Sequence, residues 1–405
     1  MLWKKKSVSH SLMSILNALF ISRRPAAAFV VVGLFWGCFA AYIPEIKTRL
    51  GVSDAGFGTL LLGSATGLVS SMWLAPILDR WLGARALQAG VVFLSLAWLV
   101  PGLMFTPFTF ALSLCLVGLG SGLLDVIMNA RVSALEAVHD KPLMNANHAM
   151  FSVAYGVAAL VVAVTREAGL PPAPVFAGFS VLCCLIAPFI WMEVPEFDTS
   201  DDQVSGGYPL WPIVLCGAIV LIAFMSEATV EAWSALHLER TLHGRAAEGA
   251  FGPAMLGLTM AIGRFSGQAV AARYSEIVVV IVASLVSAVG AVIAAIAPTP
   301  MIAYVGFGVL GLGVSVIGPM GLALVGQLVP ARLRTEAIGR TAVIGFSGFF
   351  FAPVLMGLAS DAYGLRVAFA GVAGMLLLAV PLAIVVAKIP RRHKKGAGIA
   401  PTPAT

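Results

Sequence analysis

Long apolar segments follow one another along nearly the whole chain, and the charged residues gather in the short breaks between them. One membrane-spanning helix needs about 20 apolar residues. Only 11% of the 405 residues are charged, less than half of the roughly 25% found in soluble domains, so they cannot cover a water-facing surface of this size. A soluble enzyme, a nucleic-acid-binding protein and a disordered chain are therefore excluded. Breaks at charges, Gly and Pro predict spans at 25–46, 57–78, 86–106, 108–131, 148–166, 173–192, 210–232, 251–272, 277–297, 301–328, 338–360 and 366–388.

Two of the predicted boundaries depend on proline alone. Spans three and four are separated by Pro101-Gly102 and Pro107, and spans nine and ten by Pro298-Thr299-Pro300. The joined runs 86–131 and 277–328 are too long for single crossings, so each must turn back. We expect an all-α membrane protein of twelve transmembrane helices, with ten or eleven as the alternative.

The basic residues predict how the chain is oriented. With the N-terminus in the cytoplasm, 18 Lys and Arg residues fall on the inner side and 6 on the outer side, while Arg264 lies within a span. Loops rich in Lys and Arg stay in the cytoplasm. The sequence therefore predicts a bacterial-type inner (cell) membrane protein with both termini in the cytoplasm, and the net charge of +6 follows this topology rather than nucleic-acid binding.

The halves of the chain repeat one design. Residues 193–209 are the one long polar stretch between spans, and we interpret them as a cytoplasmic linker. They divide a six-helix bundle at 25–192 from a second at 210–390, with a cytoplasmic tail at 391–405. At an offset of 194 Phe57-Gly58 matches Phe251-Gly252 and Glu45 matches Glu239, and at 193 Gly118-Leu119-Gly120 matches Gly311-Leu312-Gly313. This predicts parallel repeats, whose interface holds the site in two-bundle transporters.

Residues 1–24 precede the first span. Leu12, Ile15, Leu16 and Leu19 fall on one helical face, which suits an amphipathic helix at the membrane surface. A dispensable extension is the alternative.

No pattern in the sequence predicts an enzyme, a metal site or a cofactor. A nucleophile with a base and an orienting group is missing, and so is a metal-ligand cluster. The cysteines lie in apolar runs without Cys-x-x-Cys spacing, and we interpret them as small buried hydrophobes: Cys38, Cys115, Cys183, Cys184 and Cys216.

The loop between spans two and three resembles a known motif. Its residues Asp79-Arg80-Trp81-Leu82-Gly83-Ala84-Arg85 are similar to the Asp-Arg-x-Gly-x-Arg loop of the major facilitator superfamily, with one residue more. The resemblance extends over nearly the whole chain. It implies two pseudo-symmetric six-helix bundles, and it implies that Asp79, Arg80 and Arg85 are gating residues. We expect them to pair with the ends of span eleven or span eight in one conformation and to lose these pairs in the other.

Span four resembles one branch of that superfamily. It reads Gly118-Leu119-Gly120-Ser121-Gly122-Leu123-Leu124-Asp125-Val126-Ile127-Met128-Asn129, a Gly-rich lead followed by acid-x-x-x-Asn, as in the fucose-permease-like branch. In that branch the acid of this span is implicated in proton-coupled sugar uptake.

Asp125 is the main candidate for proton coupling. A charge that deep in a span costs on the order of 2.5–3.5 kcal/mol, so a carboxyl group there is suited to take up and release a proton. Asn129, one turn on, can bond Asp125 or a substrate hydroxyl. The alternative is a structural acid paired with a Lys or Arg of a neighbouring span.

Three further ionisable residues are candidates. Glu227 lies one turn before Glu231 on span seven, and a pair of like charges suits a proton relay. His148 begins span five and suits a proton path to the cytoplasm, or it is a surface histidine satisfied by its loop. Arg264 either binds an anionic substrate or forms a structural ion pair, for example with Asp125.

Trp36 and Tyr155 are candidates for substrate binding, because sugars favour flat apolar faces beside amides and hydroxyls; packing is the alternative.

Together these features predict a monomeric secondary carrier whose partners are a small solute, protons and membrane lipids. Proton-coupled uptake of a sugar-like substrate is the first hypothesis. Proton-driven efflux of amphipathic compounds is the second, and a non-transporting receptor or scaffold the third.

Overall fold

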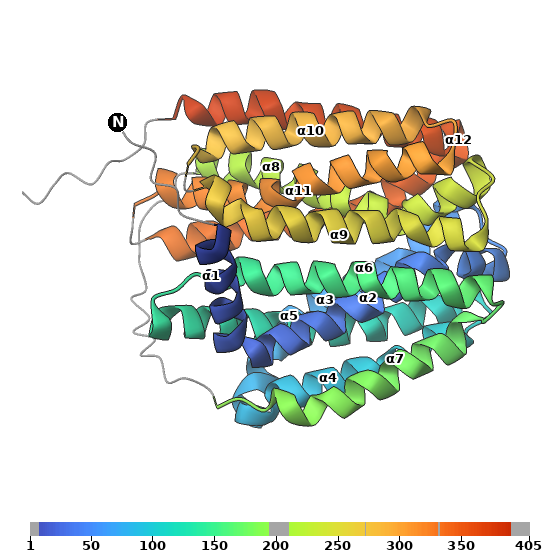
Figure 1. The fold of residues 1–405 in the computed structure, drawn as a ribbon, viewed down its shortest axis with the longest axis horizontal. Helices are drawn as coiled ribbons and strands as arrows, with labels where there is room; N and C mark the ends of the chain where they lie inside the picture. The colour runs from blue at the N-terminus through green and yellow to red at the C-terminus, as the bar shows by residue number, and fades with distance from the viewer. Residues whose placement is uncertain (1–7, 194–209, 272, 331–332, 390–405) are drawn as a thin grey trace, which may run out of the picture.

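The computed structural model describes residues 8–193, 210–271, 273–330 and 333–389. Figure 1 shows long helices that run side by side along the longest axis of the molecule, and the described residues contain no strand. The helices are α1 (Val8–Ile21), α2 (Arg23–Leu50), α3 (Asp54–Leu82), η1 (Gly83–Arg85), α4 (Ala86–Ala97), η2 (Pro101–Leu103), α5 (Pro107–His139), α6 (Met144–Glu167), α7 (Pro172–Ile186), η3 (Ala187–Ile190), α8 (Leu210–Leu236), η4 (His237–Thr241), α9 (Ala246–Ala271), α10 (Glu276–Ile296), α11 (Pro300–Leu328) and α12 (Arg334–Ala387).

The proline boundaries lie where the sequence predicts them. The chain turns through η2 before α5 begins at Pro107, and α11 begins at Pro300 four residues after α10 ends. Pro suits the first turn of a helix, where its missing N–H is not needed. Inside α12, Gly364 has a φ of 80°, so α12 is two helices joined at that residue. The all-α membrane fold is thus confirmed, and the described helices are consistent with twelve spans.

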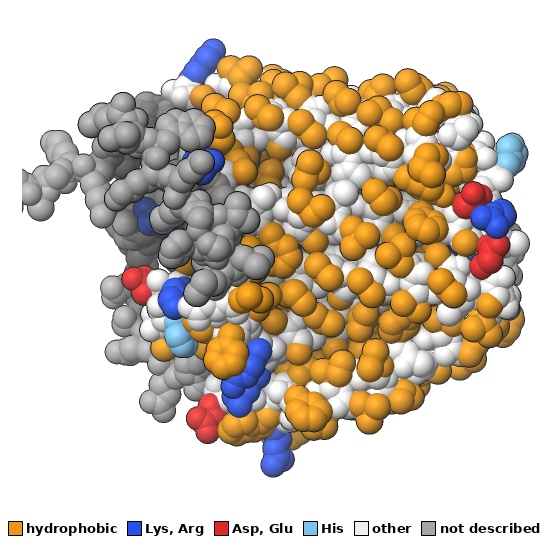
Figure 2. All heavy atoms as spheres, viewed as in Figure 1, with side chains coloured by type: hydrophobic (Ala, Val, Ile, Leu, Met, Phe, Trp, Pro, Cys, Tyr) orange, Lys and Arg blue, Asp and Glu red, His pale blue; other side chains and the backbone are white. Residues whose placement is uncertain are grey.

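Figure 2 shows apolar side chains across the middle of the molecule and charged side chains near its two ends. We call the left end in Figure 1 the terminus-bearing end, because α2 begins there and α12 ends there. The other we call the opposite end; it carries the α2–α3 turn and η4. The charged ends and the apolar middle match a helical bundle that crosses a bilayer.

Helices α2–α7 and α8–α12 form two halves (Figure 1). In the first half α5 packs along α3, and in the second α11 packs along α9. A Cβ atom on Gly118 of α5 would lie 2.0 Å from the Ser64 carbonyl oxygen of α3, and one on Gly311 of α11 would lie 2.4 Å from Thr259 Oγ1 of α9. The two glycines that the repeat aligns therefore allow the same close helix contact in each half.

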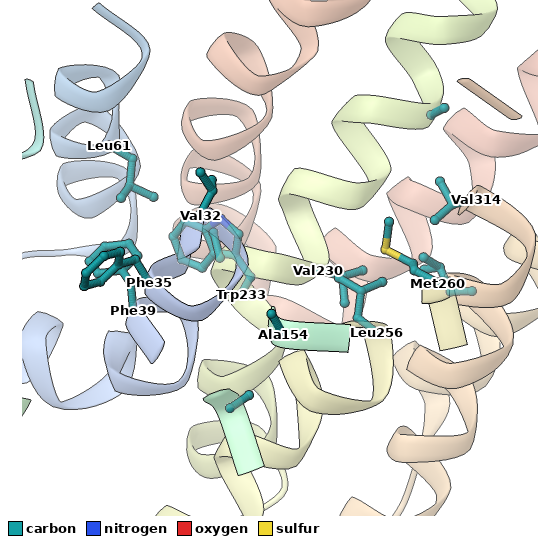
Figure 3. Close-up of a cluster of buried hydrophobic side chains, with 14 of the residues drawn as sticks. Val32, Phe35, Phe39, Leu61, Ala154, Val230, Trp233, Leu256, Met260 and Val314 are labelled. Atoms are coloured by element: carbon teal, nitrogen blue, oxygen red, sulfur yellow. The ribbon is translucent and has the colours of Figure 1, made fainter. Parts of the chain in front are cut away.

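The two halves meet along α6 and α9, along α3 and α12, and along α2 and α8. Figure 3 shows buried apolar side chains from both halves, with Val32, Phe35 and Leu61 of the first and Val230 and Trp233 of the second. Phe57 of α3 packs edge-on against Trp233 of α8, with ring centroids 6.2 Å apart. This part of the contact between the halves is therefore apolar.

Some predicted segments fall partly or wholly outside the described residues. The linker 193–209 is described only at residue 193, and the tail 391–405 lies outside. Of residues 1–24, those from Val8 onward are described. Helix α1 runs across the bundle rather than along it at the terminus-bearing end (Figure 1), and its Leu16 and Phe20 are exposed. That it lies on the membrane surface stays a prediction.

The contact between α2 and α6 is sensitive to side-chain size. A Cβ atom on Gly37 would lie 2.1 Å from the Tyr155 carbonyl oxygen, so Gly37→Ala forces the two helices apart. We expect a loss of about 1–3 kcal/mol, seen as a lower temperature at which the purified protein loses its monodisperse peak in size-exclusion chromatography. Gly178→Ala is the matched control, because its Cβ has open space. Equal midpoints for the two variants would contradict the close contact.

Candidate functional site

A cavity of about 230 Å³ lies between the two halves. Helices α2, α3, α5 and α6 line it from the first half, and α8 and the first part of α12 from the second. Most of its lining is apolar, with a small number of polar groups, which is the usual make-up of a site for a small organic molecule. The lining residues are Val32, Trp36, Phe39, Ala40, Ile43, Leu61, Ser64, Ala65, Leu68, Gly118, Ser121, Asp125, Phe151, Tyr155, Glu227, Ala228, Glu231, Ala232, Phe346, Phe349 and Pro353.

Asp125 reaches this cavity from the middle of α5. It lies 18 residues after Pro107 and 14 before His139, or about 27 Å and 21 Å at 1.5 Å per residue. Asn129 donates a hydrogen bond of 3.1 Å to Asp125 Oδ1 and one of 2.8 Å to its carbonyl oxygen. Asn129 therefore holds the carboxyl group and is not itself part of the lining.

Glu227 and Glu231 reach the cavity from α8 on the other side. Arg264 of α9 pairs with Glu227 at 3.1 Å; the Glu227 side chain is buried and that of Arg264 is 12% exposed. Arg264 also donates to Ser152 Oγ and, at 3.3 Å, to the His148 carbonyl oxygen. Arg264 is thus held by an ion pair with Glu227, not with Asp125, and it lies outside the lining that the structure describes.

The aromatic candidates differ in their polar groups. Trp36 donates its indole N–H to Ser121 Oγ at 3.2 Å. The hydroxyl group of Tyr155 is buried and has no hydrogen-bond partner among the described residues. Both rings line the cavity, and their role in substrate binding stays a prediction.

Sequence reasoning missed the four phenylalanines of the lining, namely Phe39, Phe151, Phe346 and Phe349. The spacing of Phe346 and Phe349 puts them on one helical face, but phenylalanine is common in membrane helices and gave no distinct signal. His148 lies outside the described lining, and its ring packs edge-on against Phe29 at 4.8 Å.

The predicted gating loop makes a different contact from the one we expected. Asp79 accepts hydrogen bonds from both amino groups of Arg131, one of them 3.0 Å long, and Arg131 belongs to α5 of the same half. Arg80 and Arg85 make no ion pair among the described residues. Among the described residues no ion pair joins the two halves at the terminus-bearing end, so none of the expected pairs with the second half is seen there.

The opposite end is closed by a charge cluster around Asp54, the first residue of α3. Asp54 is buried and pairs with Lys47 at 2.9 Å and with both amino groups of Arg240. From α12, Ser360 donates to Asp54, and Asp361 accepts the backbone N–H groups of Asp54 and Ala55 at 2.9 Å each. An anion at a helix N-terminus is stabilising, so α12 holds the start of α3.

A second cluster closes the same end. Arg166 of α6 makes a two-pronged ion pair with Glu239 of η4, with one bond of 3.1 Å, and donates to the Ala246 carbonyl oxygen. Arg245 pairs with Glu167 at 3.0 Å. Because both pairs join the first half to the second, the molecule is in a conformation closed at the opposite end.

Comparison with known proteins places this architecture in a family. The model of the major facilitator superfamily matches residues 215–404. An uncharacterized MFS-type transporter of Yersinia pestis is 30% identical over 366 residues, which cover 86% of this chain and 91% of that protein. The chain belongs to the major facilitator superfamily. This member is also 25% identical to the membrane protein MosC of Rhizobium meliloti, over 92% of this chain and 90% of MosC.

Solved structures agree with the fold of this superfamily member. A bacterial homolog of the human lysosomal transporter Spinster, inward-facing and occupied, has a TM-score of 0.73 at 15% identity and covers 93% of this chain and 98% of its own. The D323A mutant of the nucleoside transporter NupG has a TM-score of 0.72 at 12% identity, with 90% and 99% covered. The protein is thus an integral membrane protein of a secondary transporter family.

The role of Arg264 can be tested by a pair of substitutions. Arg264→Gln leaves Glu227 buried without its cation, which costs about 3–5 kcal/mol, so we expect a large fall in thermal stability. Adding Glu227→Gln removes the unpaired charge and should restore most of the lost thermal stability, as measured by the melting temperature in detergent. If the double variant is as unstable as Arg264→Gln alone, Arg264 does not stabilise the protein by neutralising Glu227.

Whether the Asp54 cluster closes the opposite end can be tested by measuring how fast a reagent reaches the cavity. In a Ser64→Cys protein, an impermeant maleimide applied at the opposite end reaches the cavity only when that end opens. Asp54→Asn weakens the closed conformation, and we expect labelling roughly tenfold faster, which corresponds to about 1.4 kcal/mol. Asp140→Asn, an exposed acid at the other end, is the control, and equal rates in both variants would contradict a gate at Asp54.

Proposed function

We propose that this protein exports small amphipathic organic compounds across a bacterial-type inner membrane in exchange for protons, by alternating access. The observation that carries the proposal is the central cavity, with Asp125 on one wall and an apolar, aromatic lining around it. An apolar compound can enter a cell through the bilayer unaided. An energised carrier for such a compound therefore serves to export it.

The proposed orientation puts the terminus-bearing end in the cytoplasm, because most Lys and Arg residues fall on that side. The Asp54 cluster then faces outward and closes the external side, while the cavity takes up its solute from the cytoplasm. The Spinster homolog of similar fold is described as inward-facing, which supports this assignment.

Alternating access needs two conformations with different contacts at each end. In the described conformation the ion pairs that join the two halves lie at the opposite end, and Arg264 joins them deeper in the molecule through its hydrogen bonds to α6. In the second conformation these outer pairs separate, and Asp79, Arg80 and Arg85 approach the second half. Proton binding at Asp125 changes the charge of the cavity and so shifts the balance between the two.

Proton-coupled uptake of a sugar is the second candidate. The pairing of Trp36 with Ser121 offers a flat ring beside a hydroxyl group, and span four resembles the fucose-permease-like branch. Against it stands the mostly apolar lining of the cavity, in which Ser64 already donates to the Leu61 carbonyl oxygen and Asn129 is bound to Asp125. A sugar hydroxyl group that faces this apolar lining would be buried without a partner, which costs about 1–3 kcal/mol.

Asp125→Asn separates coupling from binding. In proteoliposomes we expect this variant to lose proton-driven movement of the solute by at least tenfold, while it keeps exchange of labelled for unlabelled solute at equal concentrations on both sides. The asparagine cannot carry a proton but fills the same space. With a proton gradient directed into the liposomes, wild-type protein should expel the solute. Accumulation of the solute under the same gradient would favour the sugar-uptake candidate.

Loss of exchange together with loss of the monodisperse peak in Asp125→Asn would show that Asp125 is structural. The control is Asp140→Asn, which removes one exposed carboxyl group and should leave both activities unchanged.

A further inference from the structure

We infer that the central cavity binds a small organic cation, an aromatic or branched amine with one positive charge, and that Glu231 is the carboxylate that faces this charge. The inference deepens the proposed function, on which it rests, by naming the class of solute. It stands on the charges, the rings and the unpartnered polar groups of the cavity.

The charges of the cavity do not balance within the protein. Asp125, Glu227 and Glu231 line it, and Arg264 is the one cation that pairs with any of them among the described residues. Its charge is matched by Glu227. Asp125 has the neutral Asn129 as its partner, and Glu231 has no hydrogen bond or ion pair in the described part of the chain. Unpaired buried charges are costly, so the cavity favours ligands that bring positive charge.

Asp125 and Glu231 are the two carboxyl groups of the cavity that no basic residue neutralises among the described residues. On the return step protons neutralise them. On the outward step the organic cation takes the place of the protons, and its charge faces Glu231. An anionic ligand would meet carboxylates without a free basic residue to receive it, and a neutral ligand would leave Glu231 unpaired.

Aromatic rings surround the position that a cation would take. Trp36, Phe151 and Tyr155 line the cavity from the first half, and Phe346 and Phe349 from the second. A cation within about 6 Å of a ring face gains roughly 0.5–2 kcal/mol, and the same rings receive the apolar body of an amine. The buried hydroxyl group of Tyr155, which has no partner, remains free to donate to Glu231 or to accept from an ammonium group.

The arrangement also accounts for exchange. A proton and an organic cation both lower the negative charge of one small cavity, so the presence of one weakens the binding of the other. Such competition is what an exporter requires, because the outward step carries the cation and the return step carries protons.

The test measures binding to purified wild-type protein with three compounds of similar size. Tritiated benzyltrimethylammonium carries a permanent positive charge, N,N-dimethylbenzamide is neutral and benzylsulfonate is an anion. We expect the dissociation constant of benzyltrimethylammonium to be at least tenfold lower than the inhibition constant of N,N-dimethylbenzamide. Benzylsulfonate should not displace the bound cation. This order is read from wild-type protein alone, so it does not depend on whether any variant folds.

The variants then locate the charge. Glu231→Gln should weaken binding of benzyltrimethylammonium at least tenfold while leaving the amide unchanged, whereas Glu231→Asp should stay within about threefold of wild type. Asp140→Asn, which removes an exposed acid outside the cavity, should have no effect. Equal affinity for the three compounds, absence of cation binding at millimolar concentration, or an unchanged affinity in Glu231→Gln would each overturn the inference.

Failure of this inference differs from failure of the proposed function. If the cation binds as expected but no solute moves in response to a proton gradient, the substrate class stands and the exchange function fails. If a neutral solute is exported in an Asp125-dependent manner and benzyltrimethylammonium does not bind, the exchange function stands and the cation inference fails.

Discussion

The need to pair every charge buried within the bundle orders this structure. Inside a bilayer an unpaired ion costs several kcal/mol, and here the charged side chains of the interior meet across helices. Glu227 meets Arg264, and Asp54 meets Lys47 and Arg240. The charges left over, on Asp125 and Glu231, lie together in one cavity between the halves. The same constraint that stabilises the fold therefore marks the site.

The ion pairs that join the two halves are distributed unevenly along the molecule, so its two ends differ. At the opposite end the halves are joined through Asp54, Arg166 and Arg245, whereas Asp79 at the terminus-bearing end pairs within its own half. Between the two ends lie apolar helix contacts such as that of Phe57 with Trp233. Ion pairs between the halves at one end, with mainly apolar contacts and the hydrogen bonds of Arg264 to α6 between the ends, suit two rigid halves that rock about a central cavity.

Part of the site could be predicted from the sequence. A carboxyl residue within an apolar span is rare enough to stand out, so Asp125 and Glu227 were found without a structure, and both line the cavity. Trp36 and Tyr155, predicted to bind substrate, also line it. The roles of Arg264 and Asp79 were not determined, because each can reach several acids and the choice depends on which helices are neighbours. Glu231 was considered only as the neighbour of Glu227 in a proton relay, and the phenylalanines of α12 gave no signal among many others.

The sequence by itself determined the membrane fold, the boundaries of its helices and their repeat. These follow from local properties: apolar length, proline at helix starts, and glycine at fixed spacing. Tertiary structure alone decided which charges neutralise one another, which end of the molecule is closed, and that two carboxylates are left facing aromatic rings. The reason is physical, since a charge acts over distances in space of a few ångströms, and residues such as Asp54 and Arg240, or Glu227 and Arg264, are brought within that range only when the helices pack.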